Sequence, residues 1–206
     1  MMEKTDSTII QKLNDQLPMS LDRVERMVWF LKGYQLNDLG QLTHLNIPNY
    51  RLKGRWPREL FKLEHLEYLD IQGNDLTSLP EEISALKNLK YLDLRHNKLA
   101  ALPDSIAQLP ALEKLYLGDN KFEKIPSIIA DCPALWLIDF NDNQVIGGCE
   151  HLLDSKTIKN IYLKNNQLRS FPFHLIKEKQ IEEMNIRENK IGNNPEENHL
   201  IKNLLI

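Results

Sequence analysis

Residues 89–111 read LKYLDLRHNKLAALPDSIAQLPA, and this stretch is one unit of a repeat. Leu89, Leu92 and Leu94 form the pattern LxxLxL, and Asn97 follows three positions later. The pattern returns every 23 residues. A fixed period of this length predicts a solenoid, in which each unit buries its apolar edge against its neighbours. The first apolar position recurs at Leu66, Leu89, Leu112, Leu135, Ile158 and Ile181, and the asparagine at Asn74, Asn97, Asn120, Asn143, Asn166 and Asn189.

Each unit contains one short strand. From Tyr91 to Arg95 the residues alternate, with Leu92 and Leu94 on the inner side, and this is the periodicity of a strand with one buried face. Strands that stay in register from unit to unit build a parallel sheet, so we expect an elongated α/β fold. The seven expected strands lie near residues 44–48, 67–72, 90–95, 113–118, 136–141, 159–164 and 182–187.

The asparagine and a Leu-Pro pair organise the rest of the unit. Because an amide both donates and accepts, Asn97 can satisfy backbone groups of its own and the adjoining turn, so stacked asparagines predict a ladder. Pro103 cannot continue a sheet ladder and suits the first position of a helical turn. Ile106, Leu109 and Leu112 then recur at every third residue, which favours a 3₁₀-like return along the outer side.

These residues resemble the leucine-rich repeat family, in the short class whose units carry Leu-Pro in their second half. The resemblance covers about three quarters of the chain. It implies a right-handed, horseshoe-shaped solenoid with a parallel sheet on the concave side, and that side usually binds proteins. The family includes signalling scaffolds of animals and plants and bacterial proteins, some of them effectors.

Both ends of the chain differ from the repeat. Ser20 begins an apolar pattern with helical spacing that stops at Gly33, which predicts a capped amphipathic helix. A shorter helix is expected before it, ended by Pro18. The main alternative for the N-terminal helix is a role in binding a partner. We expect a helical N-terminal cap over residues 1–36, about seven repeats over residues 37–192, and a C-terminal capping helix over residues 193–206.

Two units depart from the pattern. Tyr50 stands where the first unit would carry asparagine, so the expected ladder starts at Asn74. In the fifth unit Gly147, Gly148 and Cys149 replace the Leu-Pro region without changing the spacing. Because glycine loosens the backbone, we expect a locally re-routed turn there; the alternative is a functional hinge.

Composition and motifs argue against several kinds of site. The net charge is −3 and the cationic residues are scattered, which argues against nucleic-acid binding. No apolar stretch is long enough to span a membrane. Phosphate-loop, dinucleotide-binding, HExxH and CxxC motifs are absent, and the histidines are dispersed. We therefore expect no catalytic residue, no cofactor and no metal, with His96 and Asp119 as neighbours on the concave rim.

The two cysteines support the same view. Cys132 is expected to be a small buried hydrophobic residue. Cys149 lies close to His151 in the sequence, but no third group orients such a pair, so a nucleophilic site is not expected there. Without cysteine-rich flanks or an apolar leader, the sequence favours a cytoplasmic protein. A secreted effector, or a leader that has been removed, is the alternative.

The outward strand positions form columns on the concave face. Parallel strands lie roughly 4.8 Å apart, so Tyr68 should lie beside Tyr91. Tyrosine and arginine on an open sheet are typical of interface anchors, the row of aspartates suggests a partner with basic residues, and Leu137 is expected as an exposed apolar spot. The residues predicted to contact the partner are Tyr68, Asp70, Tyr91, Asp93, Arg95, Tyr116, Leu137, Asp139 and Tyr162.

We therefore expect a monomeric cytoplasmic scaffold or adaptor that binds a protein or peptide on its concave face and catalyses no reaction. One alternative is a bacterial effector or another host-directed protein with the same fold. Another is the non-catalytic substrate-recognition part of a larger enzyme. The seven units and two expected caps favour a complete chain over such a part.

Overall fold

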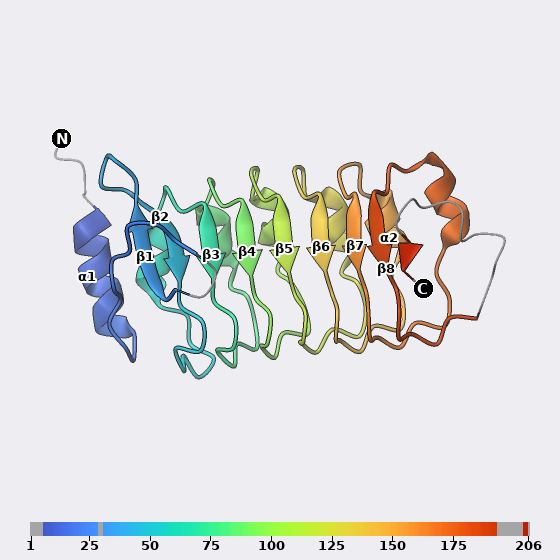
Figure 1. The fold of residues 1–206 in the computed structure, drawn as a ribbon, viewed down its shortest axis with the longest axis horizontal. Helices are drawn as coiled ribbons and strands as arrows, with labels where there is room; N and C mark the ends of the chain where they lie inside the picture. Colours follow the sequence, from blue (N-terminus) through green and yellow to red (C-terminus); the bar gives the residue numbers. More distant parts are fainter. Residues whose placement is uncertain (1–5, 29–30, 193–203, 206) are drawn as a thin grey trace.

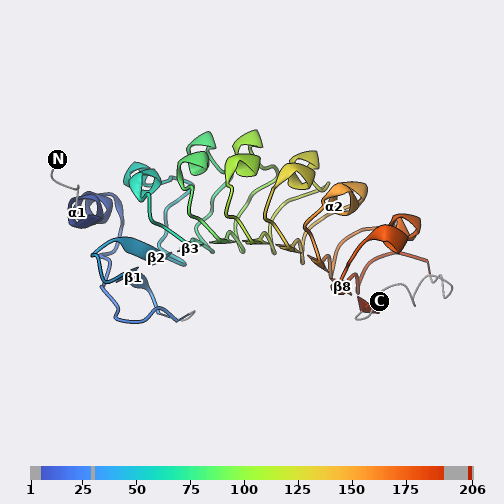
Figure 2. The same ribbon diagram turned by 90° about the horizontal axis from the view of Figure 1, so that it is seen from above.

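The computed structural model describes residues 6–28, 31–192 and 204–205. In these residues nine strands form one open sheet, with the strands in the order of the sequence. Figures 1 and 2 show the strands side by side along one curved face and short helices along the other. The sheet lies on the concave side and the helices on the convex side, so the expected solenoid is confirmed.

The seven predicted strands are present, parallel and in register. Most are shorter than expected, because only three residues of each middle unit keep the ladder geometry. The register places Tyr68 opposite Tyr91 and Asp70 opposite Asp93, as the period predicts. The strands are β2 (Leu42–Asn46), β3 (Tyr68–Asp70), β4 (Tyr91–Asp93), β5 (Lys114–Tyr116), β6 (Leu137–Asp139), β7 (Asn160–Tyr162) and β8 (Glu183–Asn185).

The convex side is built from single turns of 3₁₀-helix. Each follows a proline, whose fixed φ and missing N–H suit the start of a helical turn. The third-residue spacing of the apolar side chains therefore gives the 3₁₀ geometry that it predicts. These turns are η1 (Arg58–Lys62), η2 (Glu81–Ala85), η3 (Asp104–Gln108), η4 (Ser127–Asp131) and η5 (Phe173–Glu178).

The fifth unit takes a different path. It carries a short α-helix, α2 (Glu150–Asp154), in place of the 3₁₀ turn. Gly148, two residues before α2, has a φ of +87°, and a Cβ atom there would lie 2.8 Å from the carbonyl oxygen of Ile125. This combination favours glycine, so the predicted re-routed turn is confirmed.

One apolar core runs through the stacked units. From β3 to β8 the central residue of each strand, such as Leu92 or Leu115, is fully buried. One apolar residue near the middle of each 3₁₀-helix, such as Ile106, is buried as well. Each unit buries its apolar edge against the next one, as a solenoid requires.

The predicted asparagine ladder is present. Nδ2 of Asn97 donates to the carbonyl oxygen of Leu94 at 3.0 Å and to that of Ile71 in the preceding unit at 3.3 Å. Its Oδ1 accepts from the backbone N–H of Leu76, also in the preceding unit, at 3.0 Å. One amide thus satisfies buried backbone groups of two turns. The same pattern of bonds is made by Asn120, Asn143, Asn166 and Asn189.

The N-terminal cap is partly as predicted. The shorter helix is confirmed as α1 (Asp6–Gln16), which packs its residues Ile10 and Leu13 into the core. The longer helix predicted from Ser20 to Leu31 is wrong. The described residues of that stretch contain no helix, and β1 (Gly33–Leu36) follows it and pairs antiparallel with β2.

The sheet edge explains this outcome. An uncovered strand exposes a row of N–H and C=O groups, and β1 covers those of β2. The N–H of Tyr34 in β1 then donates to the carbonyl oxygen of Asp22 at 2.9 Å. Gly33 has a φ of +132°, and a Cβ atom there would lie 2.1 Å from that same oxygen. Gly33 therefore permits a close strand crossing and does not end a helix.

The C-terminal end also contains a strand. β9 (Leu204–Leu205) pairs in parallel with β8. The helix predicted at the C-terminus is therefore wrong for these two residues, and its remaining part lies outside the described residues. Pairing with β8 extends the sheet by one strand, which a helix could not do.

Candidate protein-binding surface

The concave face carries a ladder of aromatic rings. The rings of Tyr68 and Tyr91 are stacked, with centroids 4.2 Å apart and planes inclined by 15°. Tyr116 continues the row at 4.9 Å from Tyr91, and His44 stacks on Tyr68 at 5.6 Å. We call these four residues the aromatic ladder. Because stacked rings cover one another's faces, the ladder presents ring edges and phenol groups to a partner.

Burial changes the phenol groups of the ladder. Burial, followed by the nearby Asp70 carboxylate, raises the pKa of Tyr68 to about 12. Burial, with Asp93 as the next cause, also raises the pKa of Tyr91. Both phenols are protonated at neutral pH, and their hydroxyl groups are hydrogen-bonded to each other within the ladder.

Arg95 is held in place beside the ladder. Its Nε lies 3.0 Å from both carboxylate oxygens of Asp93, and its guanidinium carbon lies 5.3 Å from the centre of the Tyr116 ring. The hydrogen bonds to Asp93 raise the pKa of Arg95. A bidentate ion pair and a cation–π contact fix the planar group. Arg95 is thus pre-oriented, and about a third of its side chain stays exposed.

The predicted aspartate row lies beneath this surface. Asp70, Asp93 and Asp139 are 1%, 0% and 8% exposed. Each accepts a hydrogen bond from the backbone N–H two residues later, at 2.7 to 3.1 Å. Burial raises the pKa of Asp70 and of Asp139 to about 6 in each case. These carboxylates have little surface with which to contact a partner, so their influence is through the electrostatic field.

Two other predicted residues lie elsewhere. Leu137 is 8% exposed, so the prediction of an exposed apolar spot is wrong. Tyr162 is on β7, away from the ladder, and its hydroxyl donates to Oε2 of Glu183 at 2.9 Å. The structure therefore gathers Tyr68, Asp70, Tyr91, Asp93 and Tyr116 on β3, β4 and β5, together with Arg95 just after β4.

Sequence reasoning missed part of this surface. Nζ of Lys114 lies 4.9 Å from the centre of the Trp136 ring, a second cation–π pair. Trp136 directly precedes β6, so it falls outside the columns of outward strand positions. Trp136 could have been identified by also considering, in each unit, the residue directly before the first outward strand position.

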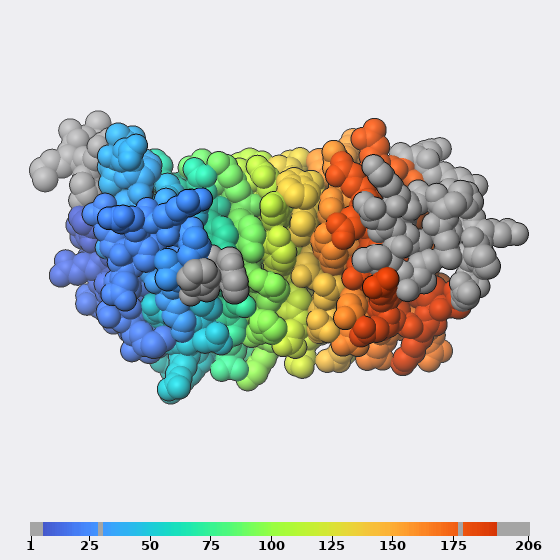
Figure 3. All heavy atoms as spheres, in the orientation of Figure 1, coloured from blue at the N-terminus to red at the C-terminus, as the bar shows by residue number. Residues whose placement is uncertain are grey.

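The N-terminal segment covers one end of the concave face. The hydroxyl of Tyr50 donates to the carbonyl oxygen of Ser20 at 3.2 Å, and Nδ2 of Asn46 donates to that of Leu31. Figure 2 shows this segment on the concave side beside β1 and β2, and Figure 3 shows it as the blue surface at one end. The N-terminal segment therefore lies beside the end of the aromatic ladder at which His44 stands, and His44 is half-buried like the three tyrosines.

Other chemistry finds no support among the described residues. Both cysteines are buried, and burial raises the pKa of Cys132 and of Cys149 to about 12, so neither is a ready thiolate. In the part of the chain that the structure describes, no three His, Cys, Asp or Glu residues are grouped to hold a metal ion, and no helix is long and apolar enough to cross a membrane. The predicted rim pair is present, with Nδ1 of His96 at 2.8 Å from Oδ2 of Asp119.

A sequence model of the leucine-rich repeat family matches residues 40–99, 64–122 and 87–145. This chain belongs to the leucine-rich repeat family. Such solenoids commonly bind other proteins on their curved surfaces. No curated protein sequence matches the chain.

Solved leucine-rich repeat structures share the fold. A leucine-rich repeat protein of Leptospira interrogans has a TM-score of 0.70 and 24% identity over 96% of this chain. This chain spans 50% of that protein. Internalin C2 of Listeria monocytogenes has a TM-score of 0.60 and 23% identity, over 80% of this chain and 70% of that one. Identities this low show the fold alone.

A plant receptor gives a similar match. The leucine-rich repeat ectodomain of the membrane receptor kinase GASSHO1/SCHENGEN3 from Arabidopsis thaliana, in complex with CASPARIAN STRIP INTEGRITY FACTOR 2, has a TM-score of 0.59 and 29% identity. The match covers 82% of this chain but 23% of that one. The leucine-rich repeat fold of this chain thus recurs in bacterial and plant proteins.

Proposed function

We propose that this leucine-rich repeat protein is a non-catalytic scaffold or adaptor that holds a protein or peptide partner against β3, β4 and β5. The row of adjoining rings carries this proposal: Tyr68 is stacked on Tyr91, and Tyr116 is tilted against Tyr91. Tyrosines that are already ordered lose little side-chain entropy on binding and supply large contact area. Arg95 adds a fixed, partly exposed guanidinium next to them.

The partner is expected to carry basic residues. Three buried carboxylates, Asp70, Asp93 and Asp139, lie under the ladder, and one guanidinium, that of Arg95, is paired with them. The remaining negative field attracts a cationic partner and speeds its association, with little direct contact. Added salt should therefore slow association more than it speeds dissociation.

The proposal is tested with a partner recovered from native lysate. The wild-type protein is compared with the double variant Tyr91→Ala and Tyr116→Ala, after circular dichroism has shown that the variant is folded. Loss of the partner from the variant supports the concave site. Sedimentation of the purified protein tests the expected monomer, and cell fractionation tests the expected cytoplasmic location.

A further inference from the structure

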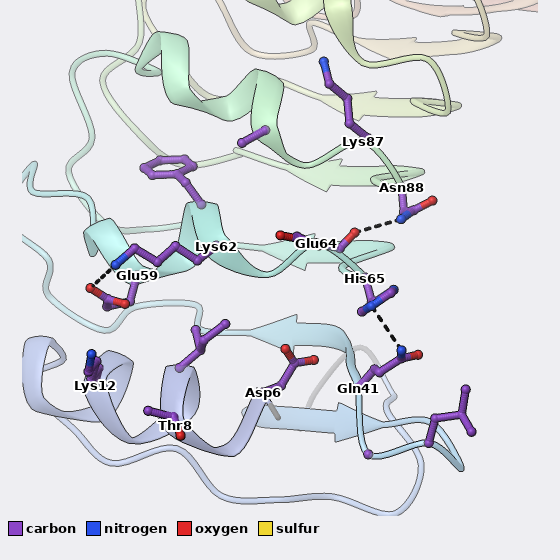
Figure 4. Close-up of a pocket in the computed structure, with 15 residues that line it drawn as sticks. Asp6, Thr8, Lys12, Gln41, Glu59, Lys62, Glu64, His65, Lys87 and Asn88 are labelled. Carbon is purple, nitrogen blue, oxygen red and sulfur yellow. Dashed lines mark hydrogen bonds and ion pairs between the residues drawn. The ribbon is translucent and has the colours of Figure 1, made fainter. Parts of the chain in front are cut away.

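A second surface lies on the convex side of the first repeat. A depression of about 810 Å³ lies between η1 and η2, with Trp56, Phe61 and Pro80 among its walls. The adjoining depression, about 900 Å³, shares Phe61 and Lys87 with it and extends to α1. Figure 4 shows the second depression, whose lining holds basic residues such as Lys12 and Lys62 together with the acidic residues Asp6, Glu59 and Glu64. Because the charges around the second depression are mixed, we call the depression between η1 and η2 alone the convex groove.

The repeat itself shows that the core does not require these aromatic residues. Trp56 occupies the position of Leu79, Leu102 and Ile125 in the next three units, and Phe61 that of Ser84, Ala107 and Ala130. Leu79 and Ile125 are 5% and 2% exposed, whereas Trp56 and Phe61, like Leu102, are only partly buried and pack against the edge of the core.

The two rings are arranged as one wall. Their centroids are 5.8 Å apart, and Nε1 of Trp56 donates to the carbonyl oxygen of Ser78 at 2.8 Å. That bond fixes the indole, so an apolar side chain would meet a preformed surface. Ordered aromatic walls of this kind are typical of binding grooves.

One charge at the groove is reversed relative to other units. Arg58 occupies the position of Glu81, Asp104 and Glu150, whereas the position of Lys87 is also lysine in two later units, at Lys156 and Lys179. The charged residues that line the depression between η1 and η2 are Arg58, Lys62, Lys87 and Glu82.

Not all of these charges are available. Lys62 is paired with Glu59 at 2.9 Å, so Arg58 and Lys87 outweigh Glu82. The whole chain has a net charge of −3. The convex groove therefore carries net positive charge, whereas the whole chain carries net negative charge. This difference favours an acidic partner at the groove.

We propose that the convex groove binds an acidic segment of a partner protein, with an apolar side chain against Trp56 and Phe61 and carboxylates at Arg58 and Lys87. The groove and the aromatic ladder lie on opposite sides of the sheet (Figure 2). The two surfaces can therefore be occupied at the same time, and the protein can bring two partners together.

The repeat supplies the test variant. Trp56→Leu, Phe61→Ser and Arg58→Glu together give the first unit the residues that the second unit carries at Leu79, Ser84 and Glu81. The probe is a short peptide of aspartate and glutamate around one central leucine, titrated into the full chain and followed by calorimetry. We expect saturable binding to the wild type and a loss of at least about tenfold in affinity for the triple variant.

Controls separate this surface from the concave one. The variant Tyr91→Ala with Tyr116→Ala should bind the acidic peptide as the wild type does. The single variant Arg58→Glu keeps both rings and should also weaken binding if the triple variant fails to fold. A matched peptide with lysine in place of the acidic residues can bind the concave face, so any binding of it should be the same for the wild type and for the groove variants.

Several results would overturn the proposal. These are no saturable binding of the acidic peptide by the wild type, equal weakening of acidic-peptide and lysine-peptide binding by the groove variants, or undiminished binding of the acidic peptide by folded groove variants. Binding of phosphatidylserine vesicles that is abolished by Arg58→Glu, without binding of the peptide, would assign the groove to a membrane surface instead. Failure of the concave-site experiment would leave these outcomes unaffected.

Discussion

The ring of Tyr68 is stacked on the ring of Tyr91, with centroids 4.2 Å apart and planes inclined by only 15°. The two residues are one repeat apart and face each other across β3 and β4. Stacking between units thus holds the two rings in one orientation, which a single strand could not do. The strand register that places Tyr68 beside Tyr91 also places the buried leucines of the two strands beside each other.

The concave aspartates should make stability depend on pH. Burial raises the pKa of Asp70 to about 6 from an ordinary value of 3.8, so the folded state binds more protons than the unfolded state between these values. The free energy of unfolding should therefore fall as pH rises from 3.8 through about 6. At pH 7 the unfavourable free energy of keeping the buried Asp70 carboxylate ionised is fully present. Urea unfolding measured across this pH range checks the direction.

Replacing one carboxylate isolates this effect. Asp70→Asn should raise the free energy of unfolding at pH 7 by about 1–3 kcal/mol and flatten its pH dependence. Asp93→Asn, by contrast, should lower stability, because Arg95 loses its ion pair. A pH dependence of Asp70→Asn equal to that of the wild type would show that Asp70 is not the group involved.

The asparagine ladder should contribute strongly to stability. Asn120→Ala leaves the buried backbone N–H of Leu99 without its acceptor, Oδ1 of Asn120. It also removes one of the two asparagine donors to the carbonyl oxygens of Leu94 and Leu117, and the loss should cost about 1–3 kcal/mol. The control is Asn88→Ala on the exposed outer side, where water can replace the side chain. Equal urea midpoints for the two variants would contradict the ladder.

Core packing gives a larger effect. Leu92 is fully buried in the centre of the stack, so Leu92→Ala should cost about 2–5 kcal/mol. Leu39 is 80% exposed, and Leu39→Ala should change stability by at most about 0.5 kcal/mol. Thermal unfolding of the two variants provides the comparison. Similar losses at both positions would be inconsistent with one core through the units.

The fifth unit offers a matched pair of glycines. At Gly148 a Cβ atom would lie 2.8 Å from the backbone of Ile125, whereas at Gly147 nothing lies within 4 Å. Gly148 also has a φ of +87°. Gly148→Ala should therefore lower stability by about 1–3 kcal/mol and Gly147→Ala by much less. If both variants unfold at the same temperature, the turn is not constrained as described.

The regular part of the fold could be predicted from the sequence because every unit repeats the same requirement. Leu92 and its equivalents must face inward, and Asn97 and its equivalents must fill the turn, so the strands, their register and the ladder follow. The stacking of Tyr68 on Tyr91 follows from that register as well.

The ends and the depth of the site could not be predicted in this way. The spacing after Ser20 suits a helix, but residues 22–24 instead form backbone hydrogen bonds with Tyr34 of β1, the strand that covers the open edge of β2. The aspartates are outward in the strand pattern, yet Asp93 is buried because Arg95 and the ladder lie around it. The alternation of strand positions predicts which side chains face outward, but it does not predict which of them are then covered by neighbouring side chains.

The most direct test of the account is the affinity of the concave face for its partner. The dissociation constant is measured for the wild type, for Tyr91→Ala with Tyr116→Ala, and for Tyr162→Ala as a tyrosine on the same sheet outside the ladder. We predict a loss of about 2 kcal/mol or more for the double variant and a smaller loss for Tyr162→Ala. Undiminished affinity of a folded double variant would show that the aromatic ladder is not the binding surface.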